Sequence, residues 1–96
     1  MQFIYKARYL KQFSRFSQQD QVLIHEADRQ VRASYATQQA PIGLRLTRLH
    51  VQGSLKVFEA RVTQAIRMVW VEEHRAVYFG LVGSHDDVQR YLRSLR

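Results

Sequence analysis

The hydrophobic period of the chain changes near Gly43, and this change constrains its fold more than any other feature. Before Gly43, apolar residues recur every three or four positions, as they do in amphipathic helices. After Gly43, apolar and polar residues alternate over several short segments, as they do in strands. A largely helical part followed by a run of strands predicts an α+β fold.

The part before Gly43 is predicted to hold one strand and two helices. Residues 3–7 are aromatic and β-branched types that favour a short strand, and residues 7–16 have helical spacing. A second helix is expected to begin at Ser17, with Asp20 three residues later as in a capping box. Its predicted apolar face consists of Leu23, Ile24, Ala27 and Val31. It should end before the proline-containing stretch 36–43.

Four strands and a last helix are predicted after Gly43. The strands are 44–50, 56–62, 65–73 and 76–82, and the helix is about 85–95. A turn at 51–54 and short connections near Gln64 and His74 indicate antiparallel hairpins. We therefore predict one domain, 1–96, in which an N-terminal strand and a helical hairpin pack on an antiparallel sheet of about four to five strands, with a short C-terminal helix.

Charge is the main compositional signal of function. The 96 residues include 15 Lys and Arg against 8 Asp and Glu, a net charge of +7, and most of the basic residues are arginine. Arginine binds phosphate oxygens in pairs, so a phosphate-bearing or acidic partner is favoured over a merely solvated basic surface. The absence of cysteine excludes disulfides and thiolate zinc sites. With no membrane-length apolar stretch and no signal-peptide pattern, we expect a soluble, cytoplasmic protein.

Strand parity concentrates charge on the central hairpin. An odd-length loop near Gln64 gives one apolar face, consisting of Phe58, Ala60, Val62, Ile66, Met68 and Trp70. The opposite face then carries Arg61 directly opposite Arg67, with Glu59 one step away. Because facing arginines repel each other, something must offset the pair. Glu59 in an ordinary surface ion pair and an anionic ligand such as phosphate are the two alternatives.

The segment 84–87 (SHDD) is predicted to begin the last helix. Ser84 suits the N-cap, and Asp87 occupies the third helical position of a capping box, so both have a structural explanation. His85 is not needed by the cap, and histidine is the side chain best suited to acid–base work near neutral pH. A metal site is disfavoured, because no second histidine stands at ligand spacing.

The order of these elements resembles the RelE/ParE superfamily of bacterial type II toxin–antitoxin toxins. The segments GLRLTRLH, KVFEARVTQAIRMVWVEE and AVYFGLVGSHDD carry the resemblance, which is strongest from Leu44 to Leu95. RelE-like members imply a metal-independent, cofactor-free endoribonuclease that cuts mRNA in the ribosomal A site. ParE-like members imply a DNA gyrase poison without nuclease activity. Either implies a cognate antitoxin as partner, and a basic binding module without catalysis is the third alternative.

The resemblance also implies catalytic roles. Arg61 falls where RelE-like toxins have a basic residue on the third strand. Arg67 matches the arginine that holds the scissile phosphate, and His85 occupies the position of the general acid. Glu59 stands where RelE has a lysine, and relatives with a glutamate–histidine pair make it a tentative general base.

Three further residues are expected to bind RNA. Arg45 and Arg48 belong to the basic strand 44–50. Tyr91 lies near the position of a base-stacking tyrosine. The alternative for Tyr91 is a core contact of the last helix, because it shares an apolar face with Val88 and Leu92.

Overall fold

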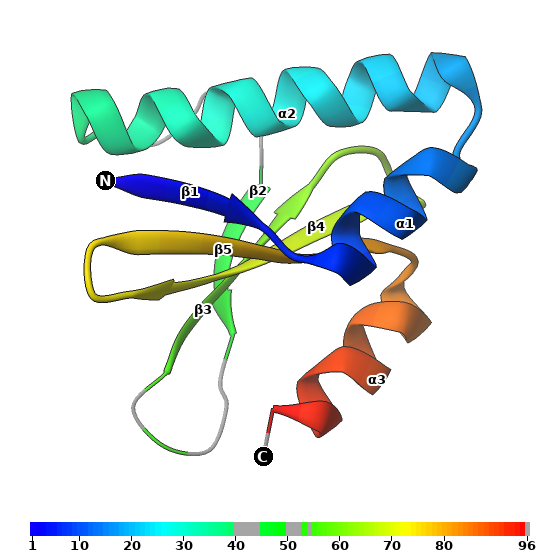
Figure 1. Ribbon diagram of the computed structural model, residues 1–96. Coiled ribbons are helices and arrows are strands. Elements are labelled where there is room, and N and C mark those ends of the chain that lie inside the picture. The colour runs from blue at the N-terminus through cyan, green and yellow to red at the C-terminus, as the bar shows by residue number, and fades with distance from the viewer. Residues whose placement is uncertain (40–44, 50–52, 54, 96) are drawn as a thin grey trace.

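The computed structural model of the chain describes residues 1–39, 45–49, 53 and 55–95. Within these residues the chain forms a five-stranded sheet and three helices (Figure 1). In chain order the elements are β1 (Gln2–Tyr5), α1 (Ala7–Arg15), α2 (Gln18–Thr37), β2 (Arg45–Leu49), β3 (Lys56–Arg61), β4 (Arg67–Glu73), β5 (Ala76–Gly83) and α3 (His85–Ser94). The predicted turn at 51–54 lies outside the described residues except for Gly53.

The sheet is mixed, with strand order β1-β5-β4-β3-β2. Strands β2 to β5 form the predicted antiparallel meander, but β1 pairs with β5 in parallel. The expectation of an antiparallel sheet is therefore wrong for β1. No hairpin joins β1 to its neighbour, so neither its edge nor its direction is fixed by a turn.

Helix α1 continues along the edge where β1 stops. The last paired residue of β1 is Tyr5, opposite Phe79. The backbone N–H of Lys6 then donates to the Phe79 carbonyl at 2.9 Å, and the backbone N–H of Val82 donates to Oε1 of Gln12 at 3.3 Å. The exposed backbone of β5 is thereby covered by a helix, which prevents pairing with another chain.

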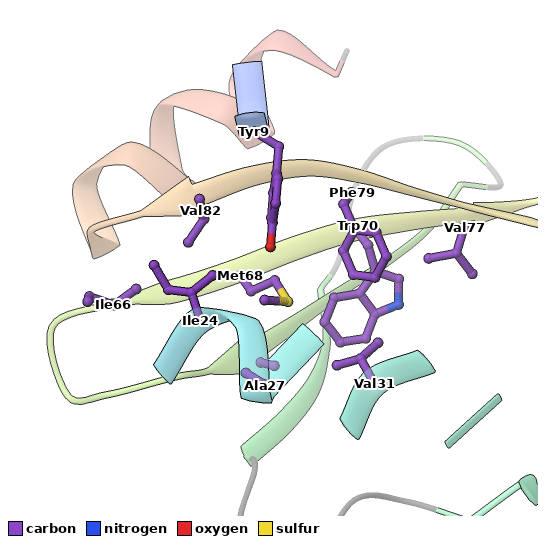
Figure 2. Packing of buried hydrophobic residues seen from close by; sticks show 11 residues of the cluster. Tyr9, Ile24, Ala27, Val31, Ile66, Met68, Trp70, Val77, Phe79 and Val82 are labelled. Atoms are coloured by element: carbon purple, nitrogen blue, oxygen red, sulfur yellow. The ribbon is translucent and has the colours of Figure 1, made fainter. Parts of the chain in front are cut away.

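Both faces of the sheet are covered. Helices α1 and α2 lie on one face and α3 lies on the other (Figure 1). Figure 2 shows the first core cluster, whose buried members are Tyr9, Ile24, Ala27, Val31, Ala60, Ile66, Met68, Trp70, Val77, Phe79 and Val82. The second cluster, under α3, contains Val57, Val69, Val71, Leu81 and Val88.

The register of the central hairpin agrees with the parity argument. Phe58 pairs with Trp70 and Ala60 pairs with Met68, and all four belong to or pack against the first cluster. The predicted apolar face is confirmed. Since its opposite face is also largely buried, the charged residues on that face lie at the border of a second core.

Helix α2 begins as predicted, with Ser17 Oγ accepting from the backbone N–H of Asp20 at 3.1 Å. Its buried face differs in one residue: Leu23 is 45% exposed, and Asp28 is buried instead. Positions 24, 27, 28 and 31 follow the spacing of one helix face, and Leu23 lies to the side of it. Asp28 tolerates burial because the hydroxyl of Tyr5 donates to its carboxylate at 2.7 Å.

The turn between β4 and β5 adopts a backbone that favours glycine. His74 and Arg75 have φ values of 51° and 64°, and they join the paired residues Glu73 and Ala76. Two left-handed residues in a two-residue loop match the right-handed twist of the strands. Neither residue is glycine or asparagine, so the tight hairpin is formed against local preference.

Among the described residues, no helix is both long and apolar enough to span a bilayer.

Candidate functional site

Three arginines lie side by side across the sheet. Arg45 pairs with Arg61, Arg61 pairs with Arg67, and Gly83 of β5 completes the line. Directly opposed side chains in such a line have Cβ atoms about 5 Å apart and point to the same face. We call Arg45, Arg61 and Arg67 the arginine row. The predicted opposition of Arg61 and Arg67 is confirmed, and Arg45 extends it by one strand.

The arginine row lies on the face covered by α3. Val69 and Val71 lie two and four residues after Arg67 on β4, and both belong to the second cluster together with Val88 of α3. Residues two apart on a strand share a face. The row is therefore held at the margin of a packed core.

Glu59 is a buried partner of the arginine row. It is 8% exposed, and its Oε1 accepts from Nη1 of Arg67 at 2.5 Å. Its cross-strand neighbour Val69 is fully buried. The ion pair of the first alternative is therefore present, but it is largely buried and does not lie at the surface. Local parity predicts the proximity of Glu59 and Arg67, but burial depends on α3 and on the packing of the second cluster.

The Nε ends of two arginine side chains in the row are buried as well. The Nε atoms of Arg61 and Arg67 are inaccessible to solvent and have no hydrogen-bond partner among the described residues. Buried polar atoms are seldom left without partners in folded proteins. With three guanidinium groups and only Glu59 against them, the row has donors and positive charge in excess of what its described surroundings use.

His85 is the first residue of α3 and is exposed. It follows Gly83, the cross-strand partner of Arg67, by two residues, so the chain returns to the end of the arginine row at this point. Because an α-helix has about 3.6 residues per turn, Asp87 and Tyr91 lie on one side of α3 and His85 lies on the other. The flank with Tyr91 faces α1, so His85 lies away from α1.

The helix start at His85 is fixed by the predicted capping box. Ser84 Oγ accepts from the backbone N–H of Asp87 at 3.2 Å, and Asp87 Oδ2 accepts from the backbone N–H of Ser84 at 2.9 Å. The hydrogen bond from the Ser84 backbone holds the pKa of the Asp87 carboxyl below its usual value, with help from Arg90 and against partial burial. Asp87 is thus engaged in structure.

Gly83 allows this cap to sit beside the arginine row. A Cβ atom at Gly83 would lie 2.6 Å from Oδ2 of Asp87, closer than any ordinary contact. The amino-acid sequence did not predict this role of Gly83. A glycine before a helix N-cap does not by itself indicate that another side chain, here that of Asp87, packs closely against it.

Tyr91 is partly buried and packs against the second cluster. Its hydroxyl lies where a Cβ of Gly80 would be, and the guanidinium carbon of Arg8 lies 5.6 Å from its ring centroid. Burial raises the pKa of the Tyr91 phenol, and the charge of Arg8 opposes the shift. These contacts agree with the packing alternative. Arg8 is a neighbour that no local pattern indicates, because it belongs to α1.

Arg48 is separated from the arginine row. It pairs with Phe58, whose side chain packs against the first cluster, so Arg48 points to the opposite face of the sheet from Arg45. The two arginines predicted together as RNA contacts are thus on different faces.

No three His, Asp or Glu side chains gather around one point within the described parts of the chain, as a metal ion would require. The arrangement that the structure does provide is a line of guanidinium groups with an exposed histidine near its end. Such a line can bind phosphate oxygens in bidentate fashion and stabilise added negative charge on them.

These features define a class of protein: a mixed five-stranded sheet with a helical hairpin on one face, a short C-terminal helix on the other, and a basic row beside that helix. Comparison with solved structures finds this architecture in the crystal structure of the archaeal RelE–RelB complex from Pyrococcus horikoshii OT3. The TM-score is 0.66 at 9% sequence identity, over 86% of this chain and 92% of that chain.

The chain therefore has the RelE fold, as predicted. At this identity the likeness concerns the fold alone. No family model matches the sequence, and no curated protein matches it either.

Proposed function

We propose that the chain is the toxin of a type II toxin–antitoxin system and that it inhibits translation by cutting mRNA in the ribosomal A site. The observation that carries the proposal is the arginine row, in which Arg45, Arg61 and Arg67 lie in register with one paired carboxylate among the described residues. A non-functional surface would gain nothing from facing arginines, which repel each other. The RelE fold supports the same proposal.

The reaction assigned to the site is an internal transfer at phosphorus. The 2′-hydroxyl of the substrate attacks the adjacent phosphate, a P–O2′ bond forms, and the P–O5′ bond breaks. A base takes the 2′ proton, and an acid protonates the leaving 5′ oxygen. The nucleophile belongs to the RNA, so the protein needs only to bind, to stabilise charge and to move protons.

Each proposed residue has one task in this reaction. Arg67 and Arg61 hold the scissile phosphate and stabilise the negative charge that grows on it. Arg45 continues the line and suits a neighbouring phosphate of the same strand. His85 is the proposed general acid, because it is exposed and follows Gly83, the cross-strand partner of Arg67, by two residues. Arg48 and Tyr91 are proposed as weaker RNA contacts only.

An antitoxin is the proposed cognate partner. The solved structure with the same fold is a RelE–RelB complex, which supports a protein partner for this chain. A basic row of this kind is a suitable target for an acidic segment of such a partner, because binding there would compete with RNA for the same charges.

The test is cleavage of a defined mRNA on programmed ribosomes, with the message ends mapped by primer extension. The proposal expects a cut inside the A-site codon, without added divalent metal beyond what the ribosome holds. An intact message with folded protein contradicts it. Broken DNA in a parallel gyrase assay would then favour a gyrase poison, and the absence of both activities would favour a basic binding module.

A further inference from the structure

We infer that Glu59 serves this site as a positioning residue that fixes the guanidinium of Arg67, and that it is not the general base. The inference rests on the proposed function, and it changes the role expected for Glu59 from proton transfer to orientation. Among the described residues of the sheet, Glu59 is the one charged residue that is buried, at 8% exposure.

The contact between the two side chains is direct and short. Glu59 Oε1 lies 2.5 Å from Nη1 of Arg67, and the two side chains are 11% and 17% exposed. A charge-assisted hydrogen bond in such a dry environment is stronger and more directional than one in water. It fixes the plane of the guanidinium, which leaves the other N–H groups of Arg67 at a set angle.

No other hydrogen bond or ion pair among the described residues orients Arg67. Its Nε is buried and lacks a hydrogen-bond partner, and the contact to Glu59 is its one described ion pair. Its cross-strand neighbour Arg61 repels it. Without Glu59, the guanidinium of Arg67 would be drawn away from Arg61 and toward solvent.

The same geometry opposes a role as base. A general base needs a free lone pair within hydrogen-bond reach of the substrate hydroxyl. One oxygen of Glu59 accepts a hydrogen bond from Arg67, and the cross-strand partners of Glu59 are Thr47 on β2 and the buried Val69 on β4. The side chain of Glu59 is also less exposed than that of Arg67, at 11% against 17%.

Two substitutions separate the roles. Glu59→Gln keeps an oxygen that accepts from Arg67 but cannot take a proton, whereas Glu59→Ala removes both functions. If Glu59 is a positioning residue, Glu59→Gln should cleave programmed mRNA at a rate within about 3-fold of the wild type. The cleavage rate of Glu59→Ala should then fall by about 100-fold, because Arg67 is misplaced. If Glu59 is the general base, the cleavage rates of both variants should fall by at least about 100-fold.

A second readout tests the geometry without RNA or ribosomes. In ¹H–¹⁵N spectra, the Nε–H of a fixed, buried arginine exchanges slowly with water. We expect the Arg67 signal in the wild type and in Glu59→Gln, and its loss in folded Glu59→Ala. Equal signals in all three proteins would overturn the inference whatever the activity.

Failure of the proposed function is distinguishable from failure of this inference. If the wild type cuts no message, the function is wrong, and binding of a single-stranded RNA oligonucleotide replaces cleavage as the measured quantity. Near wild-type binding by Glu59→Gln and weak binding by Glu59→Ala would still support positioning. If the wild type cleaves and Glu59→Gln is as inactive as Glu59→Ala, Glu59 is the base.

Discussion

Arg61 of β3 lies directly opposite Arg67 of β4, and the Nε of each side chain is buried without a hydrogen-bond partner among the described residues. Facing cations destabilise a sheet, and the buried Glu59 offsets only one of them. The arrangement is understandable if a phosphate supplies the missing negative charge. Stability is then reduced in the free protein and restored in the complex.

Arg61→Met should stabilise the free protein while it weakens RNA cleavage. The methionine keeps the apolar stem of the side chain but removes the charge that faces Arg67. We expect the free energy of unfolding to rise by about 0.5–1 kcal/mol. Urea denaturation measures it, with Arg48→Met as the matched control, because Arg48 faces Phe58. A loss of stability specific to Arg61→Met would contradict the repulsion.

Gly80→Ala should destabilise the docking of α3. Gly80 is the extra residue of an irregularity in β5, and its missing Cβ would lie 2.1 Å from the hydroxyl of Tyr91. Such overpacking costs about 1–3 kcal/mol. The double variant with Tyr91→Phe removes the colliding oxygen and should recover part of the loss. If the second substitution recovers nothing in thermal denaturation, the contact between Gly80 and Tyr91 is not the cause.

Asp87 should contribute to the acid sensitivity of the fold. Its pKa is held below the usual value by the Ser84 backbone, so its contribution is present above the pKa of the unfolded chain. That contribution is lost as the pH falls through the lower pKa of the folded state. Asp87→Asn should cost about 0.5–2 kcal/mol at neutral pH. The difference from wild type should shrink as the pH falls below about 4. A constant difference across that range would exclude this role.

Replacing His74–Arg75 by Asn–Gly should stabilise the hairpin of β4 and β5. Both positions have positive φ values, which asparagine and glycine adopt more easily. A gain of about 1 kcal/mol in the free energy of unfolding is expected. Since this turn is far from the arginine row in the sheet register, RNA cleavage should not change. Unchanged or lower stability would mean that the present turn is not strained.

Much of this fold could be predicted from local patterns. Parity alone placed Arg61 opposite Arg67, because a one-residue slip exchanges the faces of a strand. The box formed by Ser84 and Asp87 followed from residue types at a fixed spacing. These features involve residues close in sequence or joined by a short turn.

The features that could not be predicted depend on contacts between distant segments. The parallel pairing of β1 with β5 and the packing of Arg8 on Tyr91 join the two ends of the chain. The burial of Glu59 requires α3 to cover the charged face of the central hairpin, and the alternation of residues in β3 does not indicate this cover. No local sequence pattern indicates such contacts. The proximity of Glu59 and Arg67 was therefore predicted, but the burial of their ion pair was not.

The rate at which programmed mRNA is cut by Arg67→Ala, compared with wild type and with Arg29→Ala, tests the central claim most directly. Arg29 is an exposed arginine on α2 that pairs with Glu26, so its variant removes the same charge away from the row. We predict a loss of at least about 100-fold for Arg67→Ala and near wild-type cleavage for Arg29→Ala. Equal rates for the two variants would contradict the assignment of the arginine row as the site.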